Sequence, residues 1–192
     1  MEHVALPIEP WSNFYVILGS SAGGLTGLTF VVIALVADAH AVRMTGLRAF
    51  ITPTIIHFSS ALLLSALLNV PGQTLFGIGL VLGAIGVWGI LYTAGTARHV
   101  RRLAQGDYKA VAEDWIWNVL LPLICYTALL AAGMAVSSHV APALYVTAGV
   151  ALLLLFIGIH NAWDIAVWFT AERPGARTDP TKQPPPSEPP AP

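Results

Sequence analysis

The chain has 192 residues, of which 56% are hydrophobic and 10% are charged, and its formal net charge is −1. A soluble domain carries about 25% charged residues, so this composition excludes an ordinary soluble globule and indicates side chains that face lipid or other helices. The near-neutral charge gives no reason to expect a nucleic-acid partner, and the single cysteine, Cys125, excludes a disulfide within the chain.

Five apolar stretches follow one another along the chain, and each exceeds the roughly 20 residues that cross a hydrocarbon core. They cover residues 11–37, 47–70, 74–97, 115–137 and 141–169. Backbone groups in lipid must be hydrogen-bonded within their own segment, and no stretch alternates like a barrel strand, so all five are predicted to be helices. The predicted fold is therefore an all-α membrane domain of five transmembrane helices, over residues 1–172.

The basic residues predict how this domain lies in the bilayer. The nine are Arg43, Arg48, Arg98, Arg101, Arg102, Lys109, Arg173, Arg177 and Lys182. With five crossings they all fall on one side, in the first connection, the third connection and the C-terminal tail. The positive-inside rule then predicts that the N-terminus is outside and the C-terminus is cytoplasmic.

Prolines predict irregular backbone at two places. Pro53 either follows a capping Thr52 at the first helical position or marks a kinked turn at the membrane surface. Pro122 is predicted to bend the fourth helix, because it lacks an N–H and crowds the preceding turn. Residues 173–192 are rich in proline and charge, which predicts a disordered or polyproline II cytoplasmic tail, either inert or a proline-rich ligand.

Small residues recur at helical spacing in the first and third predicted helices. They are Gly19, Gly23 and Gly27 in the first helix and Gly79, Gly83 and Gly86 in the third. Such a stripe lets another helix backbone approach closely. The partner helix belongs either to the same subunit or to a second copy, and we expect a homo-oligomer.

The string Gly19-Ser20-Ser21-Ala22-Gly23 also matches the G-x-S-x-G pattern of serine hydrolases. That pattern requires a strand-turn-helix elbow and a histidine base within hydrogen-bond reach. Here it lies in a predicted helix, with His57 and His160 expected nearer the opposite side of the membrane. The match therefore predicts no catalytic residue.

Polar side chains gather at a similar predicted depth near the cytoplasmic side. They are His57, Tyr92, Asn118, His160, Asn161 and Asp164. Ionisable groups in a spanning helix are costly and usually face the bundle interior or a cavity. His160 and Asp164 are four residues apart and share a helix face. We predict that His57, His160 and Asp164 interact across the second and fifth helices.

Three interpretations of this polar cluster remain open. It is a structural network that fixes helix packing, or an ion or proton pathway, or a cofactor site. In the cofactor case, His57 and His160 would hold a haem, or would bind a divalent metal together with Asp164. No C-x-x-C-H or H-E-x-x-H motif accompanies these histidines, and we expect no cofactor.

The preferred functional hypothesis is an oligomeric membrane protein that uses the polar cluster as an ion or proton pathway. The alternative is an accessory or scaffold subunit of a membrane complex that transports nothing itself. A channel is expected to line a continuous polar path, whereas a scaffold is expected to bury its polar residues locally.

Three segments carry a resemblance to a known family: W-S-N-F-Y-V, then G-S-S-A-G-G-L-T-G-L-T-F-V-V-I-A-L, then L-L-N-V-P-G-Q. Together they resemble an uncharacterised bacterial family of small multi-pass membrane proteins, some labelled as modulators of a membrane AAA-type protease. The resemblance covers about the first 80 residues of the sequence. It implies a helical bundle in the bacterial inner membrane and carries over no catalytic residue.

Overall fold

The computed structural model of the chain describes residues 9–39, 44–103 and 112–171. The predicted tail, 173–192, lies outside these residues. The elements in chain order are η1 (Glu9–Trp11), α1 (Ser12–Ala39), α2 (Met44–Leu68), α3 (Leu75–Leu103), α4 (Ala112–Trp115), η2 (Ile116–Leu120), α5 (Leu121–Ala135) and α6 (Val140–Ala171). The prediction of an all-α protein is confirmed for the described part of the chain.

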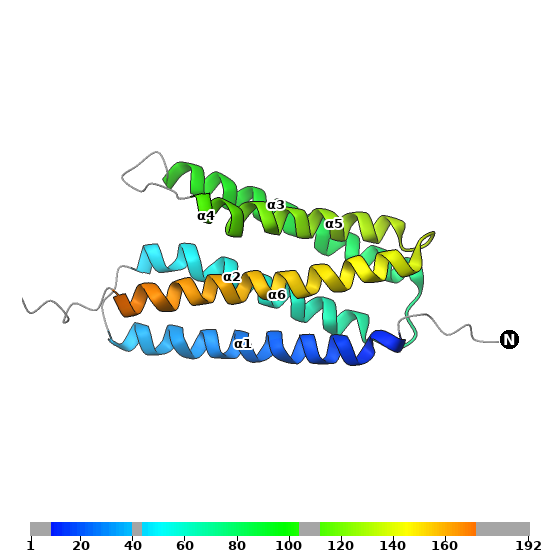
Figure 1. Cartoon of the computed structure of the whole chain (residues 1–192), viewed down its shortest axis with the longest axis horizontal. Coiled ribbons are helices and arrows are strands. Elements are labelled where there is room, and N and C mark those ends of the chain that lie inside the picture. Colours follow the sequence, from blue (N-terminus) through cyan, green and yellow to red (C-terminus); the bar gives the residue numbers. More distant parts are fainter. Residues whose placement is uncertain (1–8, 40–43, 104–111, 172–192) are drawn as a thin grey trace, which may run out of the picture.

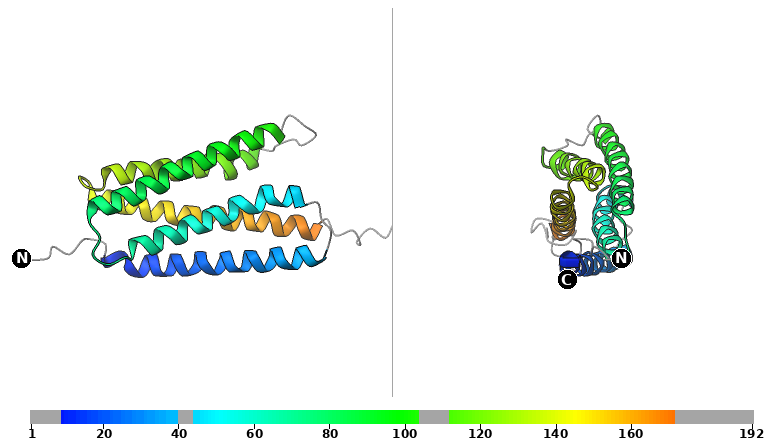
Figure 2. Two further views of the ribbon diagram at one scale, coloured as in Figure 1. Left: turned by 180° about the vertical axis from the view of Figure 1, so that it is seen from behind. Right: turned by 90° about the vertical axis from the view of Figure 1, so that its right-hand side faces the viewer.

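The long helices run side by side along the longest axis of the molecule (Figure 1). α1 packs on α2, α2 on α6, α6 on α5, and α5 on α3. In the end-on view, α3 and α5 lie on one side, α1 lies on the other, and α2 and α6 lie between them (Figure 2). The starts of α1, α3 and α6 therefore share one end of the bundle, and their C-terminal ends share the other.

In the described part of the chain, four helical segments are long and apolar enough to cross a membrane, which indicates a multi-pass membrane protein. They are Ser12–Ala34, Leu75–Arg102, Ile116–Ala135 and Val140–Val167. The apolar part of α2 is shorter and covers Thr52–Leu68.

The helix α2 continues through Pro53. It begins at Met44, so Thr52 does not cap its start and the predicted first-turn position of Pro53 is wrong, while a kink at Pro53 stays a prediction. Proline removes one hydrogen bond of the helix ladder, but such a break is tolerated where neighbouring helices enclose the backbone. Pro53 is buried in the bundle, which fits this explanation.

The predicted irregularity at Pro122 takes the form of a π-helical turn. The N–H of Leu121 donates to the carbonyl of Ile116, five residues back. Because proline has no N–H, Pro122 cannot complete an ordinary i to i−4 bond with Asn118, and the wider turn accommodates the missing donor. One predicted helix is thus divided into α4, η2 and α5.

The bundle core is apolar and closely packed. Its fully buried members include Phe58, Leu64, Ile78, Leu82, Leu129, Leu154 and Ile157. In the membrane-length segment of α6, 50% of the apolar window is buried, whereas the share in α1 is 17%. The helix α6 is therefore central in the bundle and α1 is peripheral. Large apolar side chains such as Phe76 and Met134 remain exposed, as expected of a surface that faces acyl chains.

Glycines set how closely the helices approach. A Cβ on Gly79 of α3 would lie 2.7 Å from the carbonyl oxygen of Gly133 of α5, and a Cβ on Gly133 would lie 2.8 Å from the nitrogen of Gly83. These contacts are to backbone atoms, which cannot swing aside. The absence of side chains at Gly79 and Gly133 therefore allows the close packing of α3 on α5.

The glycine stripe of α1 is used unevenly within the subunit. A Cβ on Gly19 would lie 2.9 Å from the Cβ of Ser65 on α2, so this glycine marks a close approach. A Cβ on Gly23 would meet only a methyl of Leu62, at 3.9 Å, and one on Gly27 would meet nothing within 4 Å. The packing partner of Gly27 is therefore not found within the described part of the subunit.

Candidate functional site

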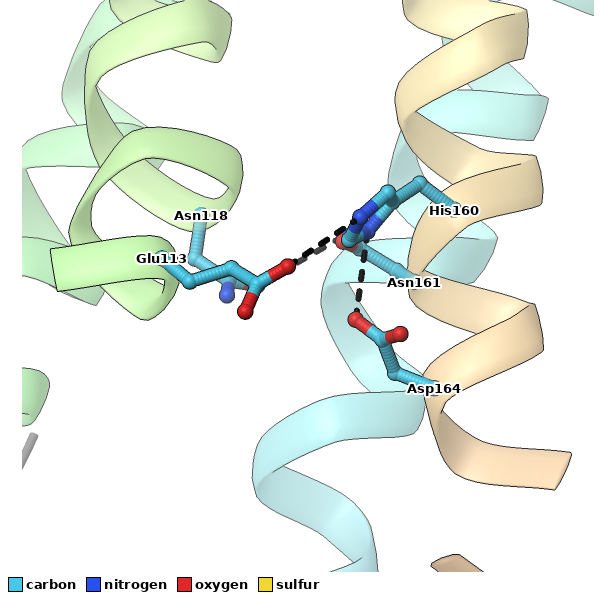
Figure 3. Close-up of polar contacts among 5 residues, drawn as sticks. All are labelled: Glu113, Asn118, His160, Asn161 and Asp164. Atoms are coloured by element: carbon cyan, nitrogen blue, oxygen red, sulfur yellow. Dashed lines mark hydrogen bonds and ion pairs between the residues drawn. The ribbon is translucent and has the colours of Figure 1, made fainter. Parts of the chain in front are cut away.

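The imidazole of His160, about two thirds of the way along α6, lies between two carboxylates (Figure 3). Its Nε2 is 3.7 Å from Oε1 of Glu113, which comes from α4. Its Nδ1 is 3.1 Å from Oδ2 of Asp164, one turn later on α6. The side chain of His160 is 22% exposed, whereas those of Glu113 and Asp164 are 66% and 56% exposed. The cluster therefore joins the protein interior to its surface.

One flat face of the His160 ring is covered by Trp117. The ring centroids are 3.6 Å apart and the planes differ by 13°. Trp117 lies in η2, whose wider turn alters the angular position of the side chains after α4. The stack restrains the orientation of the imidazole, with Nε2 on the side of Glu113 and Nδ1 on the side of Asp164.

The contact of His160 with Asp164 is an ion-pair contact and not a directed hydrogen bond. The 3.1 Å separation is short enough, yet Nδ1 is a buried atom without a hydrogen-bond partner of acceptable geometry. An imidazolium has an N–H on both nitrogens and can donate to both carboxylates, whereas neutral imidazole can donate to one.

A second polar contact lies beside the first. Nδ2 of Asn161 is 3.5 Å from Oδ1 of Asn118, at the long limit of a hydrogen bond (Figure 3). Asn161 is buried, with 6% of its surface exposed. This pair connects α6 to η2 next to the Trp117 contact and helps to hold the two segments together.

The third predicted member of the cluster, His57, belongs to a separate network. Its Nδ1 lies 3.2 Å from the hydroxyl of Tyr126 on α5, and that hydroxyl lies 3.0 Å from Oγ of Ser60. His57 is 1% exposed, and its Nε2 has no hydrogen-bond partner among the residues that the structure describes. The described residues therefore show the predicted contact of His160 with Asp164, whereas the partner of His57 is Tyr126, and an interaction of His57 with that pair stays a prediction.

The reason for this separation is the rotation of α2 within the bundle. Hydropathy predicts the depth of a residue along its helix but not the neighbour that its side chain meets. His57 meets α5, while the following residue, Phe58, packs against Gly158 of α6 so closely that a Cβ on Gly158 would lie 2.4 Å from its ring. Gly158 thus sets where α2 meets α6.

The arrangement does not build the metal site that was considered from the sequence. Within residues 9–39, 44–103 and 112–171, no group of three or more His, Cys, Asp or Glu side chains could hold a metal ion. The two nitrogens of His160 point to different carboxylates, so the three groups do not converge on one point.

Sequence reasoning missed Glu113, Trp117, Ser60 and Tyr126. A usable signal existed for Glu113 and Trp117, which lie four residues apart and just before Asn118, and so share a helix face. Tyr92, which was predicted to belong to the polar cluster, stacks on Trp88 with ring centroids 5.8 Å apart.

Comparison of this chain with protein-family models, with curated proteins and with solved structures gave no match.

Proposed function

We propose that this protein is a homo-oligomeric membrane protein that moves protons, with the His160 cluster as the group that takes up and releases them. In this proposal the chain crosses the bacterial inner membrane five times, with α2 as the fifth crossing, the N-terminus outside and the C-terminus in the cytoplasm. The observation that carries the proposal is one mostly buried imidazole held between two exposed carboxylates.

The chemistry of the cluster suits proton exchange. Histidine changes its charge near neutral pH and is a common proton shuttle. Glu113 and Asp164 reach the surface and can pass a proton between water and the two ring nitrogens of His160. Trp117 holds the ring in one orientation, so that uptake and release use defined positions.

The proposed pathway runs between copies and not through one bundle. Fully buried apolar side chains such as Leu82, Leu129 and Leu154 occupy the interior of the subunit. Ser20, Gly24 and Gly27 are exposed on α1, where a second copy can pack. A subunit contact on this face supplies a route that a single subunit does not contain.

A second candidate function is an accessory or scaffold subunit that transports nothing, and one observation favours it. Hydroxyl groups inside the helices are largely occupied by their own backbone. Those bonded to the carbonyl four residues earlier include Ser21, Thr26, Thr29, Ser60, Ser65, Thr93 and Thr147. Polar groups satisfied locally in this way are typical of packing and not of a pathway.

Proton flux in liposomes tests the two candidates. The purified full chain is reconstituted with a pH-sensitive dye inside and a potassium diffusion potential across the membrane. We expect flux for the natural protein, a loss of at least tenfold for Asp164→Asn and for His160→Gln, and unchanged flux for the matched control Asp38→Asn near the end of α1. A natural protein without flux would reject the transport proposal and favour the scaffold.

A further inference from the structure

One exposed face of α3 changes from apolar to cationic near the end of the helix. Leu80, Val87 and Leu91 are 64%, 46% and 67% exposed. Arg98 and Arg102 follow at the same seven- and four-residue steps and are also exposed. Residues at these spacings lie on one face of a helix. A single row of side chains therefore joins apolar groups to two guanidinium groups.

The arginines at this end of α3 are not neutralised by carboxylates of the described residues. The ion pairs in that part of the chain join Glu113 and Asp164 to His160. The Cζ of Arg101 lies 5.8 Å from the ring centroid of Trp115, a cation–π contact that joins α3 to α4. Within residues 9–39, 44–103 and 112–171, no ion pair joins Arg98 or Arg102 to a carboxylate, and both side chains are exposed.

We propose that this face of α3 binds an anionic phospholipid, with its phosphate against Arg98 and Arg102 and its acyl chains along Leu80, Val87 and Leu91. The inference rests on the proposal that the bundle crosses a bilayer. The planar guanidinium group forms paired hydrogen bonds with phosphate oxygens, which makes arginine well suited to this headgroup.

The spacing along the helix favours a lipid over a soluble anion. Leu91 and Arg98 are two turns apart, which is about 10 Å along the axis. This separation suits a molecule whose apolar chains and phosphate occupy successive depths of one leaflet. A soluble phosphate would contact the arginines alone and would gain nothing from the apolar side chains beside them.

Native mass spectrometry of the full chain released from detergent micelles tests this site. Phosphatidylglycerol and phosphatidylcholine with identical acyl chains are titrated separately, and bound lipid is counted. We expect tighter binding of phosphatidylglycerol, and a loss of about 30-fold in Arg98→Gln/Arg102→Gln, because each surface arginine contributes roughly fivefold to anionic lipid binding. The control Arg173→Gln/Arg177→Gln removes the same charge from the tail and is expected to leave binding unchanged.

Two results would overturn the proposal. Equal binding of the two lipids, or full phosphatidylglycerol binding by Arg98→Gln/Arg102→Gln, would show that the face does not select the anionic headgroup. Displacement of the lipid by millimolar inorganic phosphate would identify a soluble-anion site instead. Failure of the functional proposal looks different, because a chain without proton flux would still select phosphatidylglycerol, and a chain that does not float with liposomes would reject the membrane assignment itself.

Discussion

The ring of His160 lies flat on the indole of Trp117, with 3.6 Å between centroids and 13° between planes. His160 belongs to α6 and Trp117 to η2, so the contact forms where the last helix packs against the π-helical turn before Pro122. It joins the irregular backbone of the fourth predicted span to the charged cluster, and it is the first contact to test.

Removing this stack is expected to destabilise the fold. It should also reduce the effect of His160→Ala on the free energy of unfolding. Trp117→Ala should lower the free energy of unfolding by about 1–3 kcal/mol, since the indole is half-buried. A double-mutant cycle with His160→Ala should give a coupling energy of about 0.5–1.5 kcal/mol. Thermal unfolding in detergent measures both values. Trp163→Ala is the control, because Trp163 is 68% exposed, and a cycle without coupling would show that the stack contributes nothing.

The Tyr126 hydroxyl is expected to stabilise the buried contact between α2 and α5. Tyr126→Phe keeps the ring but leaves His57 without its hydrogen-bond partner in the apolar interior. The expected cost is about 1–3 kcal/mol in the free energy of unfolding. Tyr145→Phe is the matched control, since Tyr145 is exposed, and its change should stay within about 0.5 kcal/mol. Equal melting of the two variants would contradict the assigned role.

Close packing of α3 on α5 predicts a strong effect of a single methyl group. Gly133→Ala places a Cβ 2.8 Å from both the Gly79 oxygen and the Gly83 nitrogen, so the helices must separate. We expect a loss of about 1–3 kcal/mol from overpacking. Gly149→Ala on α6 adds the same methyl where nothing lies within 4 Å and should be neutral or stabilise by up to about 1 kcal/mol. Chemical unfolding of the two variants gives the comparison.

The open side of α1 predicts where copies meet. Gly27→Leu is expected to leave the melting temperature of the subunit unchanged, because a Cβ there meets nothing within 4 Å. The same change should dissociate the proposed homo-oligomer, since a bulky side chain blocks backbone approach. Light scattering of the purified protein in detergent reports the size. An oligomer of unchanged mass would place the subunit contact on another face.

The topology is tested with two single cysteines at opposite ends of the bundle. Cys125 is 1% exposed and is replaced by serine to provide the background. Val70→Cys, at an exposed position after α2, should react with an impermeant maleimide added to intact cells. His99→Cys, near the end of α3, should react only after the membrane is opened. Labelling of both positions from outside would contradict the proposed five crossings.

The candidate site was predictable where its residues share one helix. His160 and Asp164 are four residues apart, and this spacing alone indicated the contact that the structure contains. Glu113 and Trp117 come from another segment, and their approach to His160 depends on how α6 packs against η2. His57 shows the limit of such reasoning, because its position in the sequence did not indicate Tyr126 on α5 as its hydrogen-bond partner.

The sequence by itself determined that the chain is helical and apolar, because backbone groups away from water must bond within their own segment and the composition leaves few charges to solvate. It also marked the glycine positions. Only the tertiary structure decided which glycines are used, for Gly133 lies against the backbone of α3 while Gly27 faces open space. Packing depends on the rotation and crossing of each helix relative to its neighbours, and these are set by all the side chains of an interface together and not by local sequence.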